Sequence, residues 1–273
     1  MTTLIAWIGV DSRGPASLYF AADSRISWTT TGSPTWDMAR KLFATSTQPD
    51  IFGYYGDVVF TLVVLSSFVS LVDAGCLFGA DATFQERSDT LSDLVKTSFL
   101  AYPATQQREF AIIHGARERQ GKNCQFLVNV LSWSPANGWV TRSLPVCKSA
   151  QSSFLVAAYG SGGKRVETFV ENWHKAMGER TSRAIFSAFC DFMNSAGDVH
   201  SGGAPQLVGL KRVCAGKTFG VIFKDELFVH GMPIQAGGKP TAMKWVNELF
   251  EECDWETKKR RPDSQRQPRP RGL

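Results

Sequence analysis

Segments with a strand pattern and segments with a helix pattern follow one another in blocks along this chain. Apolar and β-branched residues at 2–10 predict a buried strand, and the turn at 11–15 leads into a second strand at 17–23. Further strands are expected at 40–46, 50–55, 154–158, 206–211, 218–223 and 227–230, with several more between 110 and 146. Helices are expected at 58–71, 85–100, 164–177, 181–196 and 241–253. The segment 58–71 is too long and too uniformly apolar for a strand, and we expect it to be a helix buried on most sides.

This block order limits the architecture. Strands, two helices, strands, two helices and strands pack most economically as an α+β fold, in which two antiparallel sheets face each other and the helices lie outside. We therefore expect a four-layer αββα sandwich. The sequence contains no internal repeat and no convincing linker, so residues 1–255 are expected to form a single domain, followed by a basic tail at 256–273.

The net charge of +5 comes from the end of the chain. Residues 258–273 contain seven lysines and arginines and one aspartate, which leaves −1 for the rest of the protein. A nucleic-acid-binding body is expected to carry a basic stripe, so nucleic acid is not an expected partner. The tail is rich in Pro, Arg and Gln and is predicted to be disordered. It serves either to keep the protein soluble or to dock on an acidic surface.

The cysteines and histidines have no metal-ligand spacing. Six scattered cysteines form no C-x-x-C pair, and four histidines form no H-E-x-x-H motif. We therefore expect no metal, no cofactor and no disulfide framework. The start of the chain lacks the features of a signal peptide. The longest apolar run, at 58–72, is shorter than the roughly 20 residues of a membrane span. The expectation is a cytoplasmic protein with reduced cysteines and no membrane partner.

A few polar residues stand where the apolar pattern does not require them. Asp23 and Arg25 close the second strand, and Lys41 is a lone cation beside an apolar Leu-Phe pair. Thr2 follows the initiator Met1. Taken singly, these residues are explained by a surface ion pair, a solvated strand end and chance. The glycine-rich segments at 160–163 and 201–203 are, on their own, ordinary turns.

In chain order, these features resemble a known family. The segments MTTLIAWIG, LYFAADSRIS, RKLFA, YYGD, AAYGSGGKRVE and DVHSGGAPQLV are similar to the proteasome β-subunit family. The M-T-T start is closer to the bacterial relatives of that family, the HslV-type threonine peptidases. The resemblance extends from Thr2 to about Val208 and implies the fold of the N-terminal nucleophile (Ntn) hydrolases.

The resemblance also implies a set of site residues. After removal of Met1, Thr2 Oγ1 would be the nucleophile and its α-amine the base, because an α-amine has a pKa of roughly 8. Lys41 would lower the proton affinity of that amine, and Asp23 would keep Lys41 charged. The other matches are Gly56 as the oxyanion donor, Ser161, Asp198 and Ser201 as residues that orient the amine and a water, Tyr54 as the floor of the first specificity pocket, and Ser27 as a backbone contact for an extended substrate.

Three functions remain open. The first is a threonine protease subunit in a homo-oligomeric ring that takes peptides or unfolded proteins, with a possible AAA-type ATPase unfoldase as partner. The second keeps the fold and nucleophile but acts as an amidase or acyltransferase on one small molecule or one partner protein. The third is a non-catalytic ring scaffold, which the suitable residues at every catalytic position disfavour. Extra residues at 14–17 and 115–146 depart from the family pattern and bear on ring contacts and the pocket.

Overall fold

A computed structural model describes residues 2–28, 34–195, 198–235, 238, 240 and 242–270, and it confirms the α+β fold. The large sheet has the strand order β10-β1-β2-β11-β12-β13-β14, and β15 and β16 join it through β12. Its strands are β1 (Thr3–Asp11), β2 (Gly14–Ala22), β10 (Phe154–Gly160), β11 (Gln206–Lys211), β12 (Lys217–Phe223), β13 (Glu226–Val229), β14 (Met232–Pro233), β15 (Lys244–Asn247) and β16 (Glu252–Cys253).

The second sheet has the order β5-β6-β7-β8-β9 and is antiparallel throughout. Its strands are β5 (Leu42–Ala44), β6 (Asp50–Gly56), β7 (Phe110–Glu118), β8 (Gln125–Ser134) and β9 (Gly138–Leu144). A short third sheet pairs β3 (Ile26–Ser27) with β4 (Thr35–Trp36). The strands expected between 110 and 146 are therefore present, with Asn137 and Gly138 at the turn between β8 and β9.

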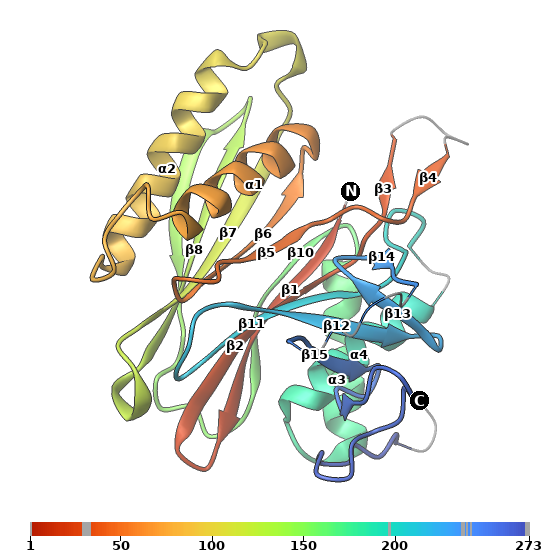
Figure 1. Ribbon diagram of the computed structural model, residues 1–273. Helices are drawn as coiled ribbons and strands as arrows, with labels where there is room; N and C mark the ends of the chain where they lie inside the picture. The colour runs from red at the N-terminus through yellow and green to blue at the C-terminus, as the bar shows by residue number, and fades with distance from the viewer. Residues whose placement is uncertain are drawn as a thin grey trace.

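Four helices predicted from the period are also present. They are α1 (Val59–Asp73), α2 (Phe84–Ala101), α3 (Gly163–Met177) and α4 (Ser182–Asn194). Figure 1 shows α1 and α2 beside the second sheet, and α3 and α4 beside the large sheet. We expected α1 to be buried on most sides, but it buries one face, and Val59 and Val63 on its other face are 63% and 59% exposed. No helix within the described ranges has both the length and the apolarity to cross a membrane.

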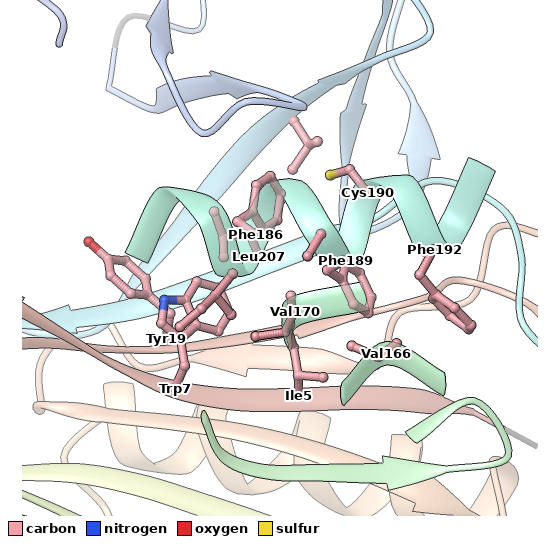
Figure 2. Packing of buried hydrophobic residues seen from close by; sticks show 14 of the residues in the cluster. Ile5, Trp7, Tyr19, Val166, Val170, Phe186, Phe189, Cys190, Phe192 and Leu207 are labelled. Atoms are coloured by element: carbon pink, nitrogen blue, oxygen red, sulfur yellow. The ribbon is translucent and has the colours of Figure 1, made fainter. Parts of the chain in front are cut away.

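Strand β1 contributes to two apolar clusters, because its side chains alternate between the two faces of the sheet. Leu4, Ala6 and Ile8 point into the apolar cluster between the two sheets, which also contains residues of β6 to β8. Ile5 and Trp7 point to the other face and pack on α3 and α4. Figure 2 shows this second cluster, in which Trp7 stacks on Tyr19 with ring centroids 5.2 Å apart.

The predicted helix at 241–253 is wrong. The segment forms β15 and β16 instead, and β15 pairs with β12 in parallel, so the large sheet is not purely antiparallel. Between these strands Asn247 Oδ1 accepts hydrogen bonds from the backbone N–H groups of Leu249 and Glu251, and Phe250 has a left-handed φ of 58°. A side chain that binds nearby backbone groups in this way favours a turn over a helix.

The C-terminal segment lies against the body as far as residue 270. Arg260 pairs with Cys253, and Gln267 is only 3% exposed, with its backbone N–H donating to Glu251 Oε1 at 2.6 Å. Arg269 forms an ion pair of 2.7 Å with Asp191 on α4. Composition predicted disorder for this segment, whereas the structure gives it these contacts. The division of the chain at residue 255 stays a prediction.

Candidate active site

A fully buried ion pair joins the residue after the end of β2 to the residue before the start of β5. Lys41 Nζ contacts Asp23 Oδ1 at 2.7 Å, and both side chains are 0% exposed. Lys41 Nζ also donates to the carbonyl oxygen of Arg25 at 2.6 Å. Burial lowers the pKa of Lys41, and the carboxylate of Asp23 opposes that effect. Because desolvating two charges is costly, a buried pair of this kind is weak evidence for stability and a marker of chemistry.

The carboxylate of Asp23 also fixes three backbone segments. Its Oδ1 accepts the N–H of Thr3 at 2.9 Å, and its Oδ2 accepts the N–H groups of Arg25 at 3.1 Å and Gly202 at 3.2 Å. Asp23 therefore joins the beginning of β1, the end of β2 and the 201–203 loop at one point. Of the two glycine-rich segments that resembled plain turns in the sequence, 201–203 thus binds Asp23 directly, and Gly162 of the other lies against Thr3 Oγ1.

A second polar network surrounds Asp198. Its Oδ2 accepts the hydroxyls of Ser201 at 2.7 Å and Ser161 at 3.0 Å, and its Oδ1 accepts the N–H of His200 at 3.0 Å. Burial acts to raise the pKa of Asp198, but these hydrogen bonds outweigh it and leave the pKa below its ordinary value. Ser201 Oγ lies 2.5 Å from Thr3 Oγ1, so this network reaches the first strand as well.

Thr2 immediately precedes β1 and is 1% exposed. Thr3 points to the helix side of the sheet, where it meets Ser201, so the alternation of the strand places Thr2 on the other side, with Leu4. Its carbonyl oxygen packs on Gly160, which has a φ of +85° and where an added Cβ would come within 1.4 Å of that oxygen. Gly160 is required there for both reasons. Met1, whose removal we predicted, lies outside the described residues.

Gly56 is the last residue of β6. It has a φ of +93°, and an added Cβ would come within 2.4 Å of the Glu109 carbonyl oxygen, so a larger residue does not fit. The preceding Tyr55 stacks on Tyr159, the neighbour of Gly160, with ring centroids 5.1 Å apart. This stack brings the end of β6 next to the strand end that faces Thr2.

Tyr54 and Ser27 are the two residues for which a role in substrate binding was predicted. Tyr54 is fully buried in the cluster under α1 and α2, and its hydroxyl donates to the Arg40 carbonyl oxygen at 2.9 Å. Ser27 pairs through its backbone strand with Thr35 of β4, and its hydroxyl lies 3.2 Å from His200 Nδ1. One edge of β3 is thus occupied within the chain. The pocket role of Tyr54 and the substrate role of Ser27 stay predictions.

Gln206 is a site residue that the sequence did not reveal. It is 1% exposed, its Oε1 accepts the N–H of Lys41 at 2.9 Å, and its Nε2 donates to the carbonyl oxygens of Asp23 at 3.0 Å and Ala39 at 2.7 Å. One amide therefore holds the two backbone segments that carry the ion pair. A single glutamine at the start of a strand has no sequence signature that predicts such a role.

Arg25 and Asp37 form a partly exposed ion pair next to the site. They form a bidentate ion pair at 2.7 and 2.8 Å, and Arg25 also donates to the Val199 carbonyl oxygen at 3.2 Å. The hydrogen bond from Arg25 lowers the pKa of Asp37. Both residues line a cavity of about 670 Å³ that also contains Asp198 and Ser201. Within the described ranges, no His, Cys, Asp and Glu group could hold a metal ion.

The chain is similar in fold to several solved structures at low sequence identity. The Anbu complex from Pseudomonas aeruginosa, in a helical assembly, is 12% identical over 86% of this chain and 88% of that chain, with a TM-score of 0.49. Eukaryotic HslV from Trypanosoma brucei is 12% identical over 77% of this chain and 99% of that chain, with a TM-score of 0.45. The Anbu ancestral β-subunit from Yersinia bercovieri is 11% identical over 77% and 82%, with a TM-score of 0.44.

No family model and no curated protein matches the chain. Similarity at this level concerns the fold alone, and the activity has to be derived from the residues of this chain.

Proposed function

We propose that this protein is an N-terminal threonine hydrolase that cleaves amide bonds, with Thr2 as the nucleophile after removal of Met1. The observation that carries the proposal is the buried Asp23–Lys41 pair, whose carboxylate also binds the N–H of Thr3, the residue next to Thr2. Replacing a buried ion pair by apolar residues is often neutral or stabilising, so stability alone does not explain this pair. The Asp198 network on the other side of Thr3 supports the same assignment.

The chemistry follows from these groups. The α-amine of Thr2 takes the hydroxyl proton as Oγ1 attacks the carbonyl carbon of the substrate, and a tetrahedral oxyanion forms. The N–H of Gly56 is proposed to donate to that oxyanion, a contact whose loss typically costs about 3 kcal/mol. The leaving amine takes the proton from the α-ammonium as the C–N bond breaks. The ester on Thr2 is then hydrolysed by a water that the α-amine deprotonates, which regenerates the hydroxyl.

Lys41 and Asp198 have different parts in this scheme. A positive charge on Lys41 beside the α-amine disfavours the ammonium form, so the amine is available as a base near neutral pH. Asp198 orients the hydroxyls of Ser161 and Ser201, which are then placed to bind the amine or the attacking water. Lys41 and Asp198, which act on the α-amine and the water in this scheme, are themselves held in place by hydrogen bonds.

The proposal extends to the assembly. We infer a four-layer αββα Ntn-hydrolase sandwich that forms a homo-oligomeric ring in the cytoplasm and degrades peptides or unfolded proteins. A ring would enclose the site, so folded substrates would need an AAA-type ATPase unfoldase. The exposed valines on α1 are available for contacts between copies.

Three measurements test the proposal. Intact mass is expected to show loss of Met1, a β-lactone is expected to label Thr2, and Thr2→Ala is expected to abolish turnover while leaving the fold intact. Thr2→Ser is the matched control, because it keeps a hydroxyl and an α-amine and should retain activity. Full activity of Thr2→Ala, or a protein that retains Met1 and stays unlabelled, would show that the mechanism is wrong.

Substrate class is tested separately. Digestion of unfolded casein, compared with a panel of small amides, distinguishes a protease from a dedicated amidase. Native mass spectrometry of the same sample gives the number of copies in the assembly. Turnover of a small amide without casein digestion would reject the protease assignment and keep the threonine nucleophile.

A further inference from the structure

A small cavity at the opposite end of β1 from the candidate site is lined by positive charge. It has a volume of about 290 Å³. In the described part of the chain its charged lining residues are Arg13, Arg119, Lys122, Lys148 and Arg212, with no aspartate or glutamate among them. Strand β1 has nine residues, so this cavity lies about 27 Å along the strand from Thr3. Figure 1 shows the β1–β2 turn, which contains the lining residue Arg13, at the end of these strands away from the N-terminus.

The five cations come from four separate connections. Arg13 is in the β1–β2 turn, Arg119 and Lys122 are between β7 and β8, Lys148 is between β9 and β10, and Arg212 is between β11 and β12. The fold thus gathers residues that are up to 199 positions apart in the sequence. The −1 charge of the body gave no sign of this arrangement, because acidic residues elsewhere balance it.

One carboxylate only partly neutralises the group. Asp11 forms a bidentate pair with Arg212 at 2.6 and 2.8 Å and contacts Arg13 at 3.5 Å. Arg119, Lys122 and Lys148 form no ion pair within the described part of the chain. The five cations and Asp11 therefore leave an excess of +4 around the cavity.

The other nearby polar groups do not remove this excess. Lys148 Nζ donates to the neutral amide of Gln125 at 2.9 Å. Glu118, which precedes Arg119, is not one of the lining residues, and its carboxylate accepts the N–H of Phe84 at the start of α2 at 2.8 Å. Like charges gathered in this way repel one another and lower stability unless a counter-charge binds among them.

The backbone conformation of Arg119 also favours a binding role for this cavity. Arg119 has a left-handed φ of 59°, which is unfavourable for a residue with a side chain. In this conformation the Arg119 side chain lines the basic cavity and also the neighbouring cavity that contains the buried Arg87 and Arg117. Strained residues of this kind are concentrated at binding sites.

We propose that this cavity binds the phosphate groups of a small polyphosphate anion. An excess of +4 matches a chain of two or three phosphates better than a singly charged ion, and guanidinium groups form strong hydrogen bonds to phosphate oxygens. A volume of about 290 Å³ is at the small end for ligand cavities, so the site holds phosphate groups and not a whole drug-sized molecule. Free polyphosphate and the phosphate tail of a nucleotide share this chemistry.

The test uses tripolyphosphate, ATP and sulfate at one ionic strength, with thermal unfolding of the full chain as the readout. Tripolyphosphate or ATP is expected to raise the Tm by about 5–10 °C at about 100 times its Kd, and sulfate is expected to have little effect. A larger shift with tripolyphosphate than with ATP identifies free polyphosphate as the source. The reverse order identifies a nucleotide.

Charge-removing variants locate the site. Lys122→Gln/Lys148→Gln is expected to weaken binding about tenfold or more, because it removes half of the excess charge. Lys96→Gln/Lys175→Gln removes the same charge from α2 and α3 and is expected to leave binding unchanged. Cys124 lines the cavity, so bound ligand should also slow its alkylation, whereas that of the exposed Cys76 should not change.

A shift no larger than that of sulfate, or one that both double variants reduce equally, would overturn the proposal. Binding does not depend on the proposed hydrolase activity. Thr2→Ala is expected to bind tripolyphosphate as the unmodified protein does, so failure of one proposal is distinguishable from failure of the other.

Discussion

At the scale of single residues, the buried pair of Asp23 and Lys41 gives the clearest energetic prediction. Lys41→Met leaves the Asp23 carboxylate in the interior without a cation, and we expect it to lower the free energy of unfolding by about 3–5 kcal/mol. The double variant Asp23→Asn/Lys41→Met should lose less than the sum of the single variants. Urea unfolding at pH 7 measures all three.

An exposed ion pair provides the matched control. Lys244 contacts Glu252 at 2.6 Å, a distance close to that of the buried pair, but the two side chains are 44% and 36% exposed. Lys244→Met is therefore expected to cost less than about 1 kcal/mol. Equal losses for Lys41→Met and Lys244→Met would contradict the view that burial sets the cost.

The lowered pKa of His230 predicts how the free energy of unfolding depends on pH. Burial, with a smaller effect of Arg40, lowers its pKa to about 4, and its Nδ1 has no hydrogen-bond partner among the described residues. The unfolded chain takes up a proton near the ordinary pKa of about 6.5, whereas the folded protein does so only near 4. The stability from neutral His230 is therefore fully present above about pH 6.5 and falls as the pH is lowered towards 4, by up to about 3 kcal/mol.

His230→Asn should weaken this dependence, because it removes the ionisable group and Asn tolerates the left-handed φ of 52°. The measurement is urea unfolding of both proteins at several values between pH 7 and pH 4.5. All other groups titrate in both proteins, so the difference between the two curves isolates His230. Parallel curves would show that the imidazole is solvated in the folded protein.

At the scale of elements, the sequence predicted what depends on local pattern. The β1–β2 hairpin and helices α1 to α4 each carry their own period and turn residues, so they could be predicted one at a time. Residues 241–253 also have a helical period, but Trp245 and Val246 gain more by pairing beside β12, where Gly220 leaves room for the Trp245 ring. Tertiary pairing outweighed propensity there.

The candidate site was predictable to a similar extent. Asp23, Lys41 and Asp198 stand out because charged residues interrupt apolar or glycine-rich segments, and the fold brings them to the start of β1. Gln206 and the basic cavity could not be predicted. Their partners come from distant connections, and neither an isolated amide nor scattered arginines form a motif.

At the scale of the whole molecule, the C-terminal segment closes over helices α3 and α4, as Figure 1 shows. Glu251 is buried, and one of its oxygens accepts the backbone N–H of Gln267. Gln267 Oε1 in turn accepts a hydrogen bond from Arg183 Nε at 3.2 Å. A chain that ends at Trp255 would leave that oxygen of Glu251 without this donor, and we expect a loss of about 1–3 kcal/mol in the free energy of unfolding.

A chain that ends at Pro268 is the matched control for this truncation. It keeps Gln267 and loses the partly exposed pair of Arg269 and Asp191, so its cost should be below about 1 kcal/mol. Urea unfolding of the full chain and both truncated chains gives the comparison. If ending the chain at Trp255 costs no more than ending it at Pro268, the segment is the free basic tail that its composition predicts. A larger cost makes it part of the folded body, and its arginines then belong to the surface that α3 and α4 present.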